Sequence, residues 1–190
     1  MNYLAERYDA AYFDFIDDTF TIDRSWVKAF CERYTLGIPF VISSRADLIV
    51  KWPEMFGWLR AAGCDAVSVG FESGNDRILG LLNKGTTRAM NLEAAEILRG
   101  HGLKIVANIM YGVPTETVDE ARDTAEMVKA IAPDVTSTAF FTPYPGCDLA
   151  EKYKELSLVE DYADMNRYPN KAKVLGVDYG GIVAMLKEYA

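Results

Sequence analysis

Stretches with a strand pattern alternate with stretches with a helix pattern through most of this 190-residue chain. A strand, a crossover of a dozen or more residues and a further strand together build a parallel sheet. Repeated βα units of this kind fold either into an open doubly wound sheet or into a complete or partial barrel. The strand patterns occupy residues 11–18, 39–45, 67–74, 104–111 and 135–141.

Capping residues and apolar periodicity predict the helices between these strands. Thr117 and Glu120 have the spacing of a capping box. Gly37 and Gly63 stand where glycines commonly end helices. The predicted helices span 23–36, 52–63, 76–82, 87–99, 118–131 and 180–189, and another begins near residue 148.

The two faces of each strand differ, and this difference favours the barrel. In the third strand Val67 and Val69 alternate with Ser68, Gly70 and Glu72. A doubly wound sheet would make both faces apolar, whereas a barrel with a ligand-filled mouth has a polar inner lining. The same alternation offers Asp14 and Asp18 (or Asp17), Ser43 and Arg45, Asn108, Met110 and Gly112, and Thr136 and Thr138. We predict an α/β fold, a partial (βα) barrel of about five parallel strands, with its site at their carboxyl ends.

Length and composition predict a single domain over residues 1–190, with a motif-bearing core at 10–150 and an irregular C-terminal extension at 151–190 that closes with a helix. The net charge of −8 provides no basic surface for nucleic acid or an anionic membrane. No apolar run is long enough to span a bilayer, and the polar start does not resemble a signal peptide. The three cysteines are far apart, which favours a reducing, cytoplasmic setting.

Two charged groups follow the first two strands. Asp17 and Asp18 can hold an ammonium group or a metal, or can form a helix-capping turn. Arg45 is predicted to point inward, where it needs an anionic partner. That partner is either a ligand carboxylate or Asp47.

The later strand ends provide groups suited to a nucleoside. Glu72 can accept two hydrogen bonds from a ribose diol. Gly112 lets a flat ring or a backbone approach closely. Glu116 is expected to accept the exposed amides at the start of the next helix. The stiff aromatic segment 141–146 suits the edge of an adenine slot.

Six blocks in this order resemble the radical S-adenosylmethionine superfamily, over about residues 10–150. Within it they resemble the subgroup often fused to a cobalamin-binding domain, typified by the anaerobic magnesium-protoporphyrin cyclase. The blocks are Phe-Ile-Asp-Asp-Thr-Phe at 15–20, Ser-Arg-Ala-Asp at 44–47, Gly-Phe-Glu-Ser-Gly at 70–74, Asn-Lys-Gly-Thr-Thr at 83–87, Tyr-Gly-Val-Pro-Thr-Glu-Thr at 111–117 and Pro-Tyr-Pro-Gly at 143–146.

The resemblance implies a cofactor, S-adenosylmethionine, lying across the strand ends. It implies that Glu72 and Ser73 contact the ribose, that the Met110 to Gly112 segment supports the adenine, and that Asn108 belongs to the same cofactor site. Phe141 and Thr142 would contact the edge of the adenine, Ser43 and Arg45 the methionine carboxylate, and Asp17 and Asp18 the methionine amino group or the substrate. In the parent protein a [4Fe–4S] cluster would cleave the cofactor reductively, and the 5′-deoxyadenosyl radical would abstract a hydrogen from a small-molecule substrate that the sequence does not identify. The subgroup also implies cobalamin in the parent protein.

One departure from the family pattern is large. The family holds its cluster with Cys-x₃-Cys-x₂-Cys after the first strand, and this chain contains no such motif. Cys31, Cys64 and Cys147 are too dispersed to supply three converging thiolates. We therefore expect a fragment with the family's second to sixth strands, inactive by itself.

Two other functions stay open at this point. One is a metal-dependent or Schiff-base barrel aldolase with Asp17, Asp18 and Glu72 as ligands, or Lys104 as the amine, although Lys104 begins its strand. The other is a non-catalytic part-barrel that assembles with a second copy or with a partner through its open sheet edges.

Overall fold

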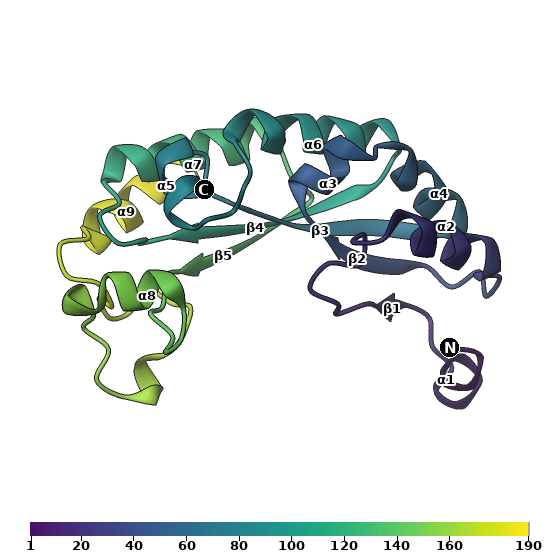
Figure 1. Cartoon of the computed structure of the whole chain (residues 1–190), viewed down its shortest axis with the longest axis horizontal. Helices are drawn as coiled ribbons and strands as arrows, with labels where there is room; N and C mark the ends of the chain where they lie inside the picture. The colour runs from purple at the N-terminus through teal and green to yellow at the C-terminus, as the bar shows by residue number, and fades with distance from the viewer. Residues whose placement is uncertain (190) are drawn as a thin grey trace. The chain divides into compact units, whose positions relative to one another are not determined.

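The computed structural model of the chain describes residues 1–189, apart from the side chain of Tyr162 (Figure 1). The described residues form a five-stranded sheet in the order β1-β2-β3-β4-β5, so the stretch that contains Glu72 is the central strand. Successive βα units in this order give the topology of a partial (βα) barrel of parallel strands, as predicted. The strands are β1 Phe13–Asp14, β2 Phe40–Ser44, β3 Cys64–Glu72, β4 Lys104–Tyr111 and β5 Val135–Phe140.

The helices agree with most of the predicted ranges. The Thr117 hydroxyl accepts a hydrogen bond from the Glu120 amide, and the Glu120 carboxylate accepts one from the Thr117 amide, so the capping box is confirmed. α1 and α3 were not predicted, and neither has a side-chain hydrogen bond at its N-cap. The helices are α1 Asn2–Tyr8, α2 Arg24–Arg33, α3 Ala46–Lys51, α4 Glu54–Ala62, α5 Asp76–Leu81, α6 Arg88–Gly100, α7 Val118–Ile131, α8 Asp148–Lys152 and α9 Tyr179–Leu186. Short 3-10 helices lie at Lys154–Leu156 and Tyr162–Asp164. None of these helices is long and apolar enough to cross a membrane, within residues 1–189.

The first strand is much shorter than the predicted range 11–18. After β1 the Phe15 amide still donates to the Val41 carbonyl at 3.1 Å. The Phe15 ring then packs against Phe20, Phe30 and Phe40 at centroid distances of 5.1, 5.6 and 5.5 Å. This aromatic packing draws the chain out of the sheet, so Asp17 lies beyond the strand and Asp18 begins the turn that follows.

The chain divides into two compact units, and the single domain over 1–190 stays a prediction. The first unit contains residues 1–70, 90–107 and 133–135. Within it α2 packs beside α4 (Figure 1). Ile42 of β2 and Val67 of β3 are fully buried, whereas Ser43 and Ser68 are half-buried and paired in register. The predicted difference between the strand faces is therefore confirmed in this unit.

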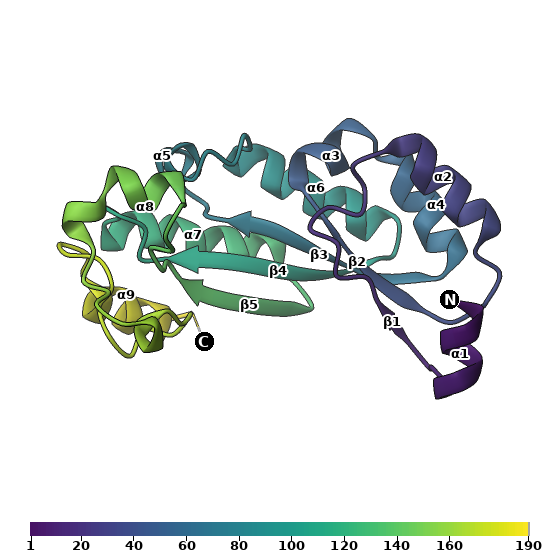
Figure 2. The same ribbon diagram turned by 60° about the horizontal axis from the view of Figure 1, so that its bottom comes forward.

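The second unit contains residues 71–89, 108–132 and 136–190. Ile109 and Tyr111 of β4 are buried, and the alternate residues Asn108 and Met110 are half-buried. In this unit α7 packs beside α9 (Figure 2). The segment 151–178, between α8 and α9, is mostly irregular.

Candidate functional site

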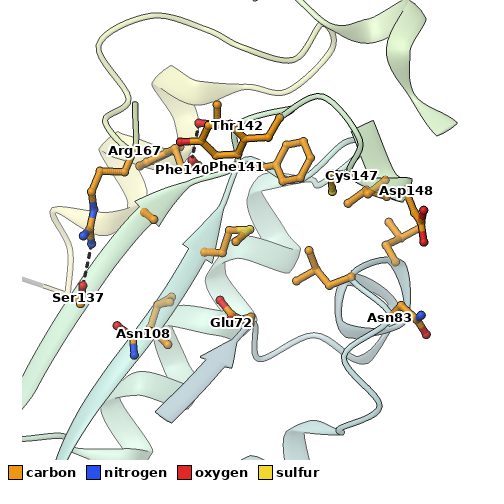
Figure 3. Close-up of a pocket in the computed structure, with 17 residues that line it drawn as sticks. Glu72, Asn83, Asn108, Ser137, Phe140, Phe141, Thr142, Cys147, Asp148 and Arg167 are labelled. Carbon is orange, nitrogen blue, oxygen red and sulfur yellow. Dashed lines mark hydrogen bonds between the residues drawn. The ribbon is translucent and has the colours of Figure 1, made fainter. Parts of the chain in front are cut away.

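A cavity of about 620 Å³ lies in the second unit, within the size range of small-molecule sites (Figure 3). Five of the predicted cofactor residues line it: Glu72, Asn108, Met110, Phe141 and Thr142. They come from the carboxyl ends of β3, β4 and β5, as a site on parallel strands requires. Glu72 and Asn108 lie on one side of the cavity, and Phe141 and Thr142 lie opposite.

Glu72 ends β3 in an unusual backbone conformation. Its φ is +62°, a left-handed value that costs energy for a residue with a side chain. Its carboxylate accepts a hydrogen bond of 2.9 Å from the Lys84 ammonium, and both side chains are only 20% exposed. The cavity therefore has an anionic hydrogen-bond acceptor that is already oriented.

The opposite wall is held by backbone hydrogen bonds. The Phe141 amide donates to the Tyr111 carbonyl at 2.7 Å. The Thr142 hydroxyl donates to the Asn166 carbonyl at 2.8 Å, which leaves the hydroxyl oxygen as an acceptor. Both side chains are buried.

The prediction of which face of β5 lines the cavity was wrong. Thr136 and Thr138 were predicted to line the inside, but Ser137 and Ala139 line the cavity. Thr136 and Thr138 line a separate hollow of about 730 Å³ with residues of α7. Polar residues occur on both faces of this strand, so polarity alone does not show which face lines the cavity.

Ser73 and Gly112 do not line the cavity. The Ser73 hydroxyl is buried against the Thr124 hydroxyl at 2.9 Å. A Cβ on Gly112 would lie 3.1 Å from the Phe140 ring and 3.4 Å from the Tyr179 ring. The flat groups that approach Gly112 are thus two of the protein's own side chains.

Glu116 is buried and bonded in a way that the sequence did not predict. Its Oε2 accepts hydrogen bonds from the Gly112 amide at 2.5 Å and the Val113 amide at 3.2 Å, and these amides precede the helix rather than begin it. Its Oε1 is buried and accepts none. Burial raises the pKa of Glu116 to about 7, and the two amides oppose this rise.

Four predicted site residues belong to the first unit. Asp17 and Asp18 are exposed. Ser43 is half-buried, and its carbonyl accepts the Phe20 amide at 3.0 Å. Arg45 donates to both carboxylate oxygens of its neighbour Asp47 at 3.0 and 3.2 Å, one of the two partners expected for it.

Lys104 is unsuited to form a Schiff base. Its ammonium donates to the Asp65 carboxylate at 3.0 Å. That hydrogen bond and the negative charge of Asp65 raise the pKa of Lys104, whereas a Schiff-base lysine needs a lowered pKa. Among residues 1–189 no group of three His, Cys, Asp or Glu side chains could hold a metal ion.

The cysteines do not fit an iron–sulfur cluster. Burial raises the pKa of Cys31 to about 11 and that of Cys64 to about 12, so both favour the neutral thiol. Cys147 lies in the other unit, exposed at the cavity. A cluster requires converging thiolates, so no step through it is assigned to this chain.

The sequence did not predict two residues that contribute to the cavity region. Lys84 follows α5 in the block Asn-Lys-Gly-Thr-Thr, and only the folded chain brings it to Glu72. Arg167 lines the cavity from the irregular segment, and its guanidinium donates to the Ser137 hydroxyl at 2.7 Å and the Thr138 carbonyl at 2.9 Å. No local pattern marks Arg167 in the sequence.

Comparisons with known proteins find similar sequences. The model of the Radical SAM superfamily matches residues 3–128. The anaerobic magnesium-protoporphyrin IX monomethyl ester cyclase of Rubrivivax gelatinosus is 29% identical over 166 residues, which is 86% of this chain and 30% of that protein. The tRNA-2-methylthio-N(6)-dimethylallyladenosine synthase of Aquifex aeolicus is 30% identical over 126 residues, 63% of this chain and 26% of that protein.

A solved structure has a similar fold. The cobalamin-dependent S-adenosylmethionine radical enzyme OxsB, with aqua-cobalamin and S-adenosylmethionine bound, matches with a TM-score of 0.73 at 15% identity. The match covers 97% of this chain and 34% of OxsB. This chain therefore spans about a quarter to a third of the length of these three proteins.

Proposed function

Because this chain belongs to the radical S-adenosylmethionine superfamily, we propose that it is the S-adenosylmethionine-binding portion of a radical enzyme. One observation carries the proposal. The cavity at the strand ends has the Glu72 carboxylate on one side and Phe141 and Thr142 opposite. The backbone of Glu72 is left-handed, and its carboxylate is hydrogen-bonded to Lys84. An anionic acceptor facing an aromatic and polar wall suits a nucleoside.

The cavity supplies a group for each part of the nucleoside. Glu72 accepts the two hydroxyl groups of the ribose. Met110 and Phe141 contact the adenine ring, and Asn108 hydrogen-bonds at its edge. The Thr142 oxygen accepts from the adenine amino group, because its own proton is donated to Asn166.

The methionine end and the wider reaction rest on the family resemblance. Ser43 and Arg45 for the carboxylate, and Asp17 and Asp18 for the amino group or the substrate, stay predictions. The bound cofactor supplies the family's radical chemistry, and the cluster ligands would come from outside this chain, so the chain itself binds but does not react. Cobalamin and an unidentified small-molecule substrate in a cytoplasmic parent protein are part of this proposal.

The net charge of −8 supports a small-molecule substrate over nucleic acid for this portion. The tRNA synthase among the relatives is the reason to test this. A filter-binding assay with total tRNA at low salt should show no retention, and saturable retention would refute the preference.

Titration calorimetry with S-adenosylmethionine tests the binding proposal. We expect saturable heat with the wild-type chain and at least tenfold weaker binding for Glu72→Ala, because a charge-assisted hydrogen bond is lost. Glu126→Ala, which removes an exposed carboxylate from α7, is the matched control. The absence of heat at millimolar cofactor would refute the proposal.

We also propose that two copies pair through the free edge of β1. That two-residue strand pairs only with β2 among the described strands, and Tyr12 and Ile16 beside it are exposed. Unpaired strand edges with exposed apolar residues favour association. Sedimentation velocity should show a dimer that Ile16→Lys weakens, and a strictly monomeric wild type would refute the pairing.

A further inference from the structure

The turn that follows β3 is strained at Glu72. The Ser73 amide donates to the Phe71 carbonyl at 2.8 Å, which closes a three-residue turn with Glu72 at its centre. Three-residue turns whose central φ is positive are rare and strained, and Glu72 has a φ of +62°. Such a conformation persists only where the surrounding structure imposes it.

A single hydroxyl on α7 holds the residues that come next. Thr124 Oγ1 accepts the Gly74 amide at 2.9 Å and lies 2.9 Å from Ser73 Oγ. Thr124 Oγ1 also lies 3.3 Å from the Glu120 carbonyl oxygen, to which it can donate. Ser73 and Thr124 are fully buried, so water cannot replace these bonds.

The turn also lies directly against α7. A Cβ on Gly74 would stand 2.5 Å from the Asp123 carbonyl oxygen and 2.8 Å from the Thr124 Cα. The Asn75 side chain donates to the Asp123 carboxylate at 2.7 Å. The segment after Glu72 therefore has its position set by α7, some fifty residues further along the chain.

We propose that Thr124 is a positioning residue for the cofactor site. Its hydroxyl anchors Ser73 and Gly74, and this anchor keeps Glu72 left-handed with its carboxylate at the cavity. Thr124 does not line the cavity, so it acts through Glu72. The effect on ligand binding rests on the proposed function, whereas the effect on the Glu72 backbone does not.

Calorimetry with S-adenosylmethionine separates positioning from general support of the fold. Thr124→Val removes the hydroxyl and keeps the shape, and we expect about tenfold weaker binding. Thr124→Ser should restore binding, and Thr136→Val on β5 should leave it unchanged. In a Glu72→Ala background Thr124→Val should have no further effect. An equal loss in both backgrounds would overturn the inference.

Backbone NMR shifts of Glu72, which report the sign of φ, test the same inference without ligand. Thr124→Val should abolish the left-handed shifts and the slow exchange of the Gly74 amide, and Thr124→Ser should keep both. Unchanged Glu72 shifts would overturn the inference, even if the cofactor binds. Altered shifts in a chain that binds no cofactor would refute the proposed function and uphold the role of Thr124. If Thr124→Val does not fold, Thr124→Ala provides the same comparison.

Discussion

The Lys84 ammonium lies 2.9 Å from the Glu72 carboxylate, and both side chains are mostly buried. Lys84→Met should lower the free energy of unfolding by about 1 kcal/mol, since partly buried pairs exceed most surface pairs. In a Glu72→Gln background the same substitution should cost little. Urea denaturation of the four proteins measures this coupling, and additive effects would show that the pair contributes nothing.

Gly74 and Gly80 offer a matched pair of substitutions. Gly74→Ala places a Cβ within 2.8 Å of the α7 backbone, so we expect destabilisation of about 3 kcal/mol. Gly80 lies in α5 with open space around it, so Gly80→Ala should stabilise the chain by about 0.5–1 kcal/mol. Thermal unfolding compares them, and similar midpoints would contradict the close packing of the turn on α7.

Because of Glu116, the free energy of unfolding should decrease as the pH rises toward 7. Its folded pKa of about 7 lies above the ordinary glutamate value of 4.5, so the native state binds the proton more tightly. The resulting stabilisation, about 3 kcal/mol, is fully present below pH 4.5 and is lost as the pH rises to 7. Urea denaturation between pH 4 and 8 should show this fall in the wild type and not in Glu116→Gln.

Glu120 provides the control for that prediction. The hydrogen bond from Arg77 lowers the pKa of Glu120 to about 2. Its stabilisation is therefore present above pH 4.5 and is lost as the pH falls toward 2. Glu120→Gln should keep most of the fall in stability between pH 4.5 and 7, because the charge of Glu120 is only a minor cause of the raised pKa of Glu116. Loss of that fall in Glu120→Gln would contradict the assignment to Glu116.

Cys147 should react first with iodoacetamide at pH 8. It is exposed at the cavity, whereas burial raises the pKa values of Cys31 and Cys64 to about 11 and 12. Intact-mass and peptide analysis should find one fast adduct, at Cys147, that S-adenosylmethionine slows. Urea-unfolded chain should show no such protection. Fast labelling of Cys64 would contradict the packing of its strand.

Arg167 closes the outer edge of β5. Its carbonyl accepts the Phe140 amide at 2.8 Å, and its guanidinium donates to the Thr138 carbonyl. Arg167→Ala should expose this edge and shift sedimentation toward larger species than the wild type. Arg99→Ala, on an exposed part of α6, should not. An unchanged distribution for Arg167→Ala would show that the backbone contact suffices.

The sequence by itself determined the order of the five strands and of most helices, the capping box at Thr117 and the apolar faces of β2, β3 and β4. These features depend on residues within a few positions of one another, where periodicity and turn chemistry act. Strand alternation also singled out Glu72, Asn108 and Met110 near the ends of their strands, and the family resemblance added Phe141 and Thr142.

Only the tertiary structure decided which partners these residues have. Lys84 reaches Glu72, Thr124 holds Gly74 and Arg167 closes β5 across separations of 12, 50 and 29 residues. The tertiary structure also decided that Ser137 rather than Thr138 lines the cavity, and that the Ser73 hydroxyl contacts the Thr124 hydroxyl of α7. Local propensity carries no information about such contacts, because they form only when packing brings distant segments together.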